Sequence, residues 1–142
     1  MKENIVCSGA LFYSTSTKRF LFLQRTDMKT QGTWGLVGGQ AHFTESAFEG
    51  LKREITEEVG DTPNFKKVIP LELFTSNDQK FFFHTYLIAI DGEFLPKLNS
   101  EHSGYCWCAF ECWPKNLHGG LKNTLNNKSI KGKLQTILDL IV

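Results

Sequence analysis

The chain has 142 residues, of which 41% are hydrophobic and 13% aromatic, and its formal net charge is +1. This length is the commonest for one domain and suffices to bury a core, so we expect a single domain over residues 1–142. The near-neutral charge, without clustered Lys and Arg, argues against a nucleic-acid partner, and no apolar run is long enough to span a bilayer.

The first part of the chain predicts strands. We expect one strand near residues 5–13, another near 19–25, and short extended pieces around 33–42. The first segment is interrupted by Ser8 and Gly9, so it resembles a strand more than a secretory signal.

Residues 46–59 have the pattern of an amphipathic helix. Its apolar residues recur at steps of three, four and four and form one stripe: Phe48, Leu51, Ile55 and Val59. Ser46 and Glu49 have the spacing of a capping box at the helix start, and Gly60 is suited to end it in a left-handed conformation. Gly50 in mid-helix costs about 1 kcal/mol relative to Ala. We therefore expect another part of the backbone to approach it closely.

The rest of the chain predicts a hairpin, a strand and a closing helix. Extended segments at 71–76 and 80–90 are separated by Asn77-Asp78, a suitable turn, and a further strand should surround Trp107. Apolar residues at helical spacing predict an amphipathic helix near the end: Ile130, Leu134, Ile137, Leu138 and Ile141. This order of elements predicts a layered α/β or α+β domain.

Three glutamates on the central helix indicate chemistry. Glu54, Glu57 and Glu58 lie three and four residues apart, which places them on one side of the helix, where their charges repel. They lie beside or opposite the apolar stripe, so they need not be buried. Arg53 can reach either Glu49 or Glu57 as an ion-pair partner. A solvated helix face is the ordinary alternative, but a hard cation such as Mg²⁺ would explain the clustered carboxylates.

A longer constellation surrounds these glutamates. Five residues separate Gly39 from Glu45, and seven more lead to Arg53; the full segment is GQAHFTESAFEGLKREITEEVG. It resembles the Nudix hydrolase signature G-x(5)-E-x(7)-R-E-U-x-E-E-x-G-U, where U is a bulky aliphatic residue. So many fixed positions make a chance match negligible. The last U is Asp61 here, and Val37 replaces the proline of the family's common W-x-L-P-G-G lead-in.

The resemblance extends more loosely to both sides of this segment, residues 39–60, which we call the box. Residues 20–25 look like the family's second strand, which usually ends in a basic residue, here Arg25. Glu101 stands six residues before Trp107, where many members supply a further acidic residue to the active site.

The resemblance implies a mixed β-sheet sandwiched between helices and a hydrolase that cleaves the pyrophosphate linkage of nucleoside diphosphate derivatives. It implies that Mg²⁺ or Mn²⁺ is held by Glu54, Glu57 and Glu58, and that the Gly39 carbonyl joins them. By position, Arg53 would orient a glutamate, while Glu45 and Gly60 would support the box.

The general base stays open between the box glutamates and Glu101. His102 beside it can titrate near neutral pH, but a His in a polar loop is more often a surface residue. We expect the same of His42 and His84.

Substrate contact is expected from aromatic side chains, on which a base can stack, together with Arg25. The aromatic candidates are Phe12, Trp34, Phe43 and Tyr86. The expected partner is a nucleotide-type small molecule: ADP-ribose or a sugar nucleotide first, nucleoside triphosphates next, and RNA caps less so. The alternative function is a nucleotide-binding sensor of the same fold without turnover.

Four cysteines, at positions 7, 106, 108 and 112, have poor spacing for zinc. In a strand, Cys106 and Cys108 share one face, and Tyr105 and Trp107 share the other. We expect reduced packing residues, hence an intracellular, cytoplasmic protein. The sequence does not decide between a monomer and a homodimer.

Overall fold

The computed structural model describes residues 4–141, so residues 1–3 and 142 of the expected domain lie outside the described range. The strands are β1 (Ile5–Ser14), β2 (Arg19–Arg25), β3 (Trp34–Gly35), β4 (Val37–Gln40), β5 (Lys67–Thr75), β6 (Phe81–Ile90) and β7 (His102–Ala109). The helices are α1 (Ala47–Val59), α2 (Gly119–Asn126) and α3 (Lys128–Leu140). No helix in this range has the length and apolar character that crossing a membrane requires.

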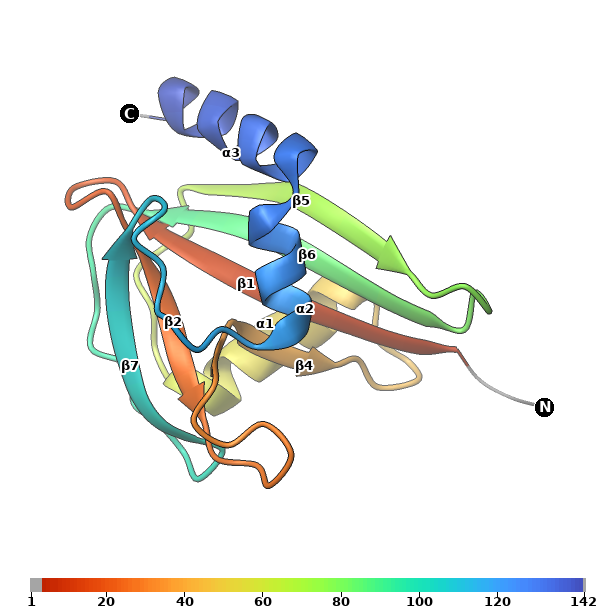
Figure 1. Ribbon diagram of the computed structural model, residues 1–142. Helices are drawn as coiled ribbons and strands as arrows, with labels where there is room; N and C mark the ends of the chain where they lie inside the picture. Colours follow the sequence, from red (N-terminus) through yellow and green to blue (C-terminus); the bar gives the residue numbers. More distant parts are fainter. Residues whose placement is uncertain (1–3, 142) are drawn as a thin grey trace.

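The strands form one mixed sheet organised around β1 (Figure 1). The order β3-β2-β1-β6-β5 runs across the sheet, with β4 also paired to β1 and β7 to β2. β1 runs parallel to β6 along its whole length, from Ile5 opposite Phe81 to Ser14 opposite Ile90. The other pairings between these strands are antiparallel. The first strand of the chain is therefore the centre of the fold.

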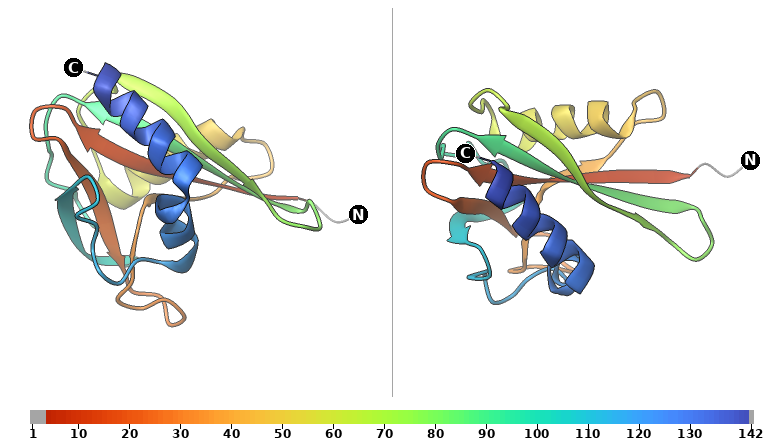
Figure 2. Two further views of the ribbon diagram at one scale, coloured as in Figure 1. Left: turned by 45° about the horizontal axis from the view of Figure 1, so that its top comes forward. Right: turned by 90° about the horizontal axis from the view of Figure 1, so that it is seen from above.

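Helices cover both faces of the sheet. Figure 2 shows α1 on one face and α2 with α3 on the other. The α1 stripe of Leu51, Ile55 and Val59 packs on Phe12 and its neighbours, while Leu121, Leu125 and Leu134 pack on the opposite face. The expected mixed sheet between helices is confirmed, and the fold is α+β.

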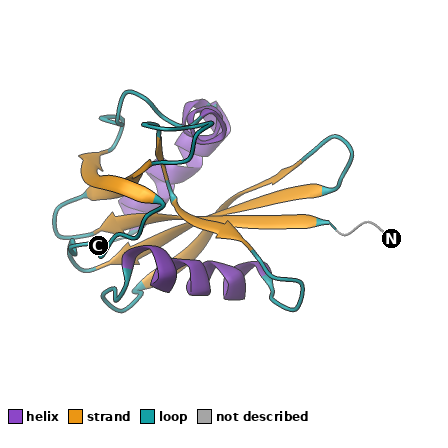
Figure 3. Ribbon diagram, turned by 90° about the horizontal axis from the view of Figure 1, so that it is seen from below, coloured by secondary structure: helices purple, strands orange, loops and turns teal. Residues whose placement is uncertain are grey.

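One end of the sheet extends beyond the helices. The β5–β6 hairpin and the start of β1 project past both helical layers (Figure 3). The predicted turn is present, since Ser76 Oγ donates to Asp78 Oδ1 at 2.6 Å and the Gln79 N–H donates to the Ser76 carbonyl. β5 begins at Lys67, four residues earlier than the sequence pattern predicted.

The sequence did not predict α2. Gly119 and Gly120 stand at its start, and glycine disfavours helices, so local propensity hides this element. Its apolar Leu121 and Leu125 are buried against the sheet, which supplies the stabilisation that propensity lacks.

Candidate active site

The start of α1 is fixed by the predicted capping box. The Glu49 N–H donates to Ser46 Oγ at 3.1 Å, and the Ser46 N–H donates to Glu49 Oε1 at 2.8 Å. A Cβ atom on Gly50 would lie 2.9 Å from the Ala41 Cα, so the expected close backbone approach is confirmed. Gly60 ends the helix with the predicted positive φ of 77°, although its ψ of −145° is not that of a left-handed helix. The loop preceding α1 therefore lies tightly against the helix.

Arg53 joins that loop to the helix. Its guanidinium donates to both carboxylate oxygens of Glu45, at 2.8 and 3.1 Å, and to the Gln40 carbonyl at 3.0 Å. Its remaining nitrogen contacts Glu57 at 3.2 Å and Glu54 at 3.4 Å. The hydrogen bonds that Glu45 accepts from Arg53, together with one from the His42 N–H, lower the pKa of Glu45 to about 2. Of the two ion-pair partners open to Arg53 in the sequence, Glu57 is the one contacted.

Glu54 lies against the backbone of β4. A Cβ on Gly39 would stand 2.6 Å from Glu54 Oε2, so only glycine leaves room for this carboxylate. The side chain of Glu54 is 15% exposed. Its burial raises its pKa, and the charges of Glu57 and Glu101 add to this effect, while Arg53 opposes it.

Glu58 is buried, with 2% of its surface exposed. It accepts a hydrogen bond from the Gly38 N–H at 3.0 Å. Burial raises its pKa to about 8, and the nearby Glu54 and Glu101 carboxylates contribute to the rise. The prediction that the glutamates need not be buried is wrong here, because β4 closes over the side of α1 that carries Glu58.

Glu101 comes to the same place from a distant loop. It is exposed, and its charge acts on both Glu54 and Glu58. Its N–H donates to Asn99 Oδ1 at 2.9 Å, and Asn99 Nδ2 donates to the Glu57 carbonyl at 2.9 Å. The structure thus brings together the box glutamates and the later acidic residue.

These groups form an acidic cluster with oxygen ligands only. Within residues 4–141, no three His, Cys, Asp or Glu side chains are arranged to hold a metal ion as they stand. The donor chemistry nevertheless fits a hard divalent cation, because carboxylate oxygens are what Mg²⁺ prefers. Glu57 is half exposed and Glu101 is exposed, so both carboxylates are accessible to a cation from solvent.

The substrate-contact candidates are scattered. Phe12 is fully buried and packs edge-on against Phe65 and Phe94, so its predicted contact with substrate is wrong. The sequence pattern of β1 could not show this. Because both faces of the strand are covered, alternation of apolar and polar residues does not indicate which side chains are exposed. Trp34 is partly buried against the core on the α2 side, whereas Phe43 is 85% exposed. For these two, contact with substrate stays a prediction.

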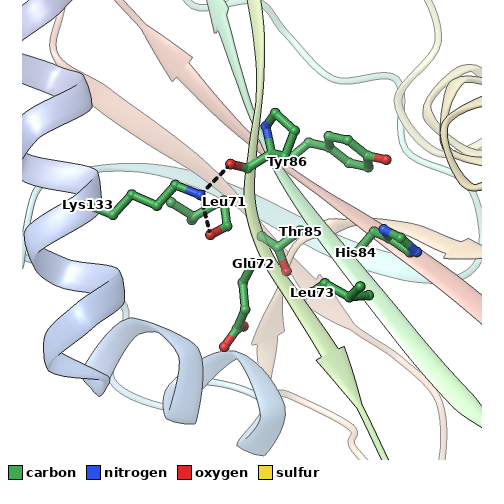
Figure 4. A pocket seen from close by; sticks show the side chains of 8 residues that line it. Leu71, Glu72, Leu73, His84, Thr85, Tyr86 and Lys133 are labelled. Carbon is green, nitrogen blue, oxygen red and sulfur yellow. Dashed lines mark hydrogen bonds between the residues drawn. The ribbon is translucent and has the colours of Figure 1, made fainter. Parts of the chain in front are cut away.

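Arg25 and Tyr86 lie apart from each other. Arg25 pairs with Asp27 at 2.9 Å, in the loop after β2. Tyr86 stacks near His84 and lines a cavity of about 270 Å³ between β5, β6 and α3. Figure 4 shows this cavity, with Lys133 donating to carbonyls of β5. The ring of Tyr86 itself packs on the α1 face of the sheet, edge-on to Phe48 of α1 with ring centroids 5.4 Å apart. Contact of Arg25 and Tyr86 with substrate stays a prediction.

His102 is buried, contrary to the expectation of a surface residue. It is 8% exposed because it begins β7 and pairs with Arg25 of β2. Among side-chain atoms of residues 4–141, its Nδ1 is buried without a hydrogen-bond partner. Burial, helped by the Arg25 charge, lowers the pKa of His102 to about 4. His42, by contrast, is 65% exposed as expected.

The cysteines are free, as expected. Cys106 and Cys108 lie on one face of β7 with their sulfur atoms 3.7 Å apart, and both pack against the core on the α2 side. Burial raises the pKa of Cys106 to about 12, which suits an inert packing residue.

Two residues at the site were not singled out by sequence. Gly38 supplies the N–H that binds Glu58, and Asn99 joins the Glu101 loop to α1. Gly38 stands in the lead-in to the box, which was a usable signal. Asn99 has backbone partners only, so no pattern of side chains marks it.

Comparisons with known proteins agree with this fold. A sequence model of the NUDIX domain matches residues 5–126. Among solved structures, the MutT NUDIX hydrolase from Burkholderia pseudomallei is 22% identical, with 89% of this chain and 99% of that chain covered and a TM-score of 0.72. The Ap4A hydrolase of C. elegans is 19% identical, with 95% and 99% covered and a TM-score of 0.71.

A longer structure is also similar. The bifunctional NMN adenylyltransferase/ADP ribose pyrophosphatase from Francisella tularensis is 19% identical, with 98% of this chain and 42% of that chain covered and a TM-score of 0.61. At these identities the likeness shows the fold alone, and no curated protein matches significantly. The domain match over most of the length nevertheless decides the family: this chain belongs to the Nudix family.

Proposed function

We propose that this protein hydrolyses the pyrophosphate linkage of nucleoside diphosphate derivatives with the help of Mg²⁺ or Mn²⁺. The observation that supports this most is the convergence of Glu54 and Glu58 on α1 with Glu101 from a loop more than forty residues later. Like charges so placed oppose one another, and two of them are largely buried. A cluster of this kind is best explained by a cationic ligand.

The cation would be held by Glu54, Glu57 and Glu58, with the Gly39 carbonyl as a further oxygen ligand. When bound, it neutralises phosphate charge and lowers the pKa of a coordinated water. Arg53 fixes the surroundings: it is bonded to Glu45, Glu57 and the loop before α1, so the glutamates keep their places as the polyanionic substrate enters.

The water that attacks phosphorus must give up its proton to a nearby base. Glu101 is one acceptor, because it is exposed and close enough for its charge to act on both Glu54 and Glu58. A glutamate of the box is the other. The two assignments differ in one measurable property, since a base can be neutralised without loss of metal affinity, whereas a ligand cannot.

The substrate class follows from the proposed chemistry. The names of two structural neighbours, an Ap4A hydrolase and an ADP ribose pyrophosphatase, support testing both compounds. We place ADP-ribose and sugar nucleotides first and nucleoside triphosphates next. Arg25, Trp34, Phe43 and Tyr86 are the proposed contacts.

The test is turnover of a nucleotide panel. Purified protein is incubated with ADP-ribose, a sugar nucleotide, Ap4A and nucleoside triphosphates, with Mg²⁺, with Mn²⁺ or with EDTA, and the products are separated by ion-exchange chromatography. We expect hydrolysis of at least one compound, abolished by EDTA and by Glu58→Gln. Nucleotide binding without turnover of any compound would overturn the proposal and favour the sensor.

A further inference from the structure

The loop of residues 97–101 is bonded to the end of α1. The last carbonyl groups of a helix have no partner within it and need one outside. Here the Lys97 N–H donates to the Val59 carbonyl at 2.8 Å. Asn99 Nδ2 donates to the Glu57 carbonyl at 2.9 Å. This loop therefore completes the end of the helix that carries the acidic cluster.

The same Asn99 side chain holds Glu101. Its Oδ1 accepts the Glu101 N–H at 2.9 Å, the two-residue spacing of an Asx turn. A side-chain amide both donates and accepts, so one residue connects the Glu57 backbone to the Glu101 backbone. Aspartate would keep the turn but lose the donor, and would add a negative charge at the helix C-terminus, where it is unfavourable.

We propose that Asn99 is a positioning residue that holds Glu101 near the box glutamates Glu54 and Glu58. The inference rests on the proposed hydrolysis, in which Glu101 acts as base or ligand. Two hydrogen bonds through a single side chain form a short link between the helix and the loop. A displacement of about 1 Å in a reacting group can lower a rate 100-fold, so such a link matters to the chemistry.

A second tie to the same loop provides a matched control. Thr26 Oγ1 donates to the Ser100 carbonyl at 2.8 Å, and the Thr26 N–H donates to the Glu101 carbonyl at 3.1 Å. Thr26→Val removes one side-chain hydrogen bond of similar length, but it leaves the link between Glu101 and α1 intact. A loss of loop stability alone would affect both variants in the same way.

The kinetic test uses the substrate that the panel identifies. Asn99→Ala and Asn99→Asp should lower kcat by about 10- to 100-fold with KM within about threefold, because the lost positioning acts on the chemical step. Thr26→Val should stay within about threefold of the native kcat. Added to Glu101→Gln, Asn99→Ala should cause no further loss of kcat, because the effects of residues acting through one group do not add. Full additivity in the double variant would overturn the inference, as would native kcat in Glu101→Gln.

Hydrogen exchange separates failure of this inference from failure of the proposed function, because it needs neither substrate nor metal. The Glu101 amide should exchange at least about tenfold faster in Asn99→Ala than in the native protein, because its acceptor is gone. Asn99→Asp and Thr26→Val should retain protection at that amide. Unchanged exchange in Asn99→Ala would overturn the inference, whether or not any nucleotide is hydrolysed.

Discussion

Gly39 and Glu54 lie so close together that a side chain on the first would displace the second. A Cβ on residue 39 would stand 2.6 Å from Glu54 Oε2. Because Gly39 does not have a positive φ, alanine fits its backbone, and the atom that must move is the free end of a side chain. We expect Gly39→Ala to change the unfolding free energy by less than about 1 kcal/mol. It should lower kcat/KM by about 10- to 100-fold through the shifted carboxylate.

Gly132 provides the control for the added methyl group. It lies within α3, and nothing stands within 4 Å of the position of its Cβ. Gly132→Ala should therefore raise the unfolding free energy by about 0.5–1 kcal/mol and leave turnover unchanged. Native turnover in Gly39→Ala would show that the position of Glu54 is not important for the reaction.

Glu58→Gln tests the buried carboxylate. The glutamine keeps the volume and an oxygen that accepts the Gly38 N–H, so we expect a change in unfolding free energy within about 1 kcal/mol. Activity should fall by about 100-fold or more, because removing a metal ligand should reduce activity more than removing a residue that only hydrogen-bonds to a ligand. Steady-state kinetics and chemical denaturation measure the two quantities. Unchanged turnover would mean that the metal site has been misplaced.

Glu101→Gln distinguishes a base from a ligand. If Glu101 is the base, kcat should fall by about 100-fold or more while the Mn²⁺ dissociation constant stays within about threefold of the native value. Calorimetric titration of the chelator-stripped protein with Mn²⁺ measures the second quantity. A variant that binds Mn²⁺ much more weakly would make Glu101 a ligand and leave the base among the box glutamates.

Divalent cations should stabilise the native state. An ion that binds only the folded protein adds about 2.7 kcal/mol at 100 times its dissociation constant. We expect the Tm of chelator-stripped protein to rise with added Mg²⁺ or Mn²⁺, and the rise to disappear in Glu54→Gln and Glu58→Gln. A Tm that does not respond to either ion, with no heat of binding, would remove the metal from the proposed mechanism.

The burial of His102 should make its contribution to stability depend on pH below neutral. Its folded-state pKa is about 4 and its ordinary value 6.5, so between these values the unfolded chain binds a proton that the folded protein does not. The contribution of His102 is therefore fully present above pH 6.5 and declines as the pH falls toward 4, by at most about 3 kcal/mol. Glu58, whose folded-state pKa is raised to about 8, acts in the opposite direction over part of this range. The Arg25 charge adds to the depression of the pKa and Asp27 opposes it.

The measurement is urea denaturation at several pH values. His102→Asn cannot titrate, so the native protein should lose unfolding free energy relative to this variant as the pH falls from 7 to 5. Glu58 is present in both proteins, so its effect cancels in the difference. The pKa of His118 is also lowered, but His118 is present in both proteins and contributes equally. Parallel profiles would show that His102 does not contribute to the pH dependence of stability.

Features that depend on neighbours along the chain could be predicted from the sequence. The capping box of Ser46 and Glu49, the close approach at Gly50 and the positive φ of Gly60 are all present. The two caps follow from the local backbone conformation, and the approach of Ala41 to Gly50 follows from the loop directly before the helix. The glutamate spacing and the box resemblance likewise marked the helix on which the site is built.

Features that depend on contacts between distant segments could not be predicted. The burial of Glu58 requires β4 to lie beside α1, and the burial of Phe12 requires both faces of β1 to be covered. Asn99 binds a backbone carbonyl and a backbone N–H, and because nearly every residue has these groups, the identities of its partners do not indicate the contacts. The resemblance singled out Glu101, but only the fold shows what holds it near the box.

The parallel pairing of β1 with β6 affects how a newly made chain can assemble. Ile5 pairs with Phe81 and Ser14 with Ile90, so the strand translated first lacks its parallel partner until β6 has left the ribosome. Such distant pairings slow folding, because a long loop must lose conformational entropy on closing before any stabilising contact between the two strands forms. The acidic helix is synthesised well before that moment, and Glu101 only after it. The carboxylate cluster, which includes Glu101, therefore cannot be complete until the chain has been made beyond β6.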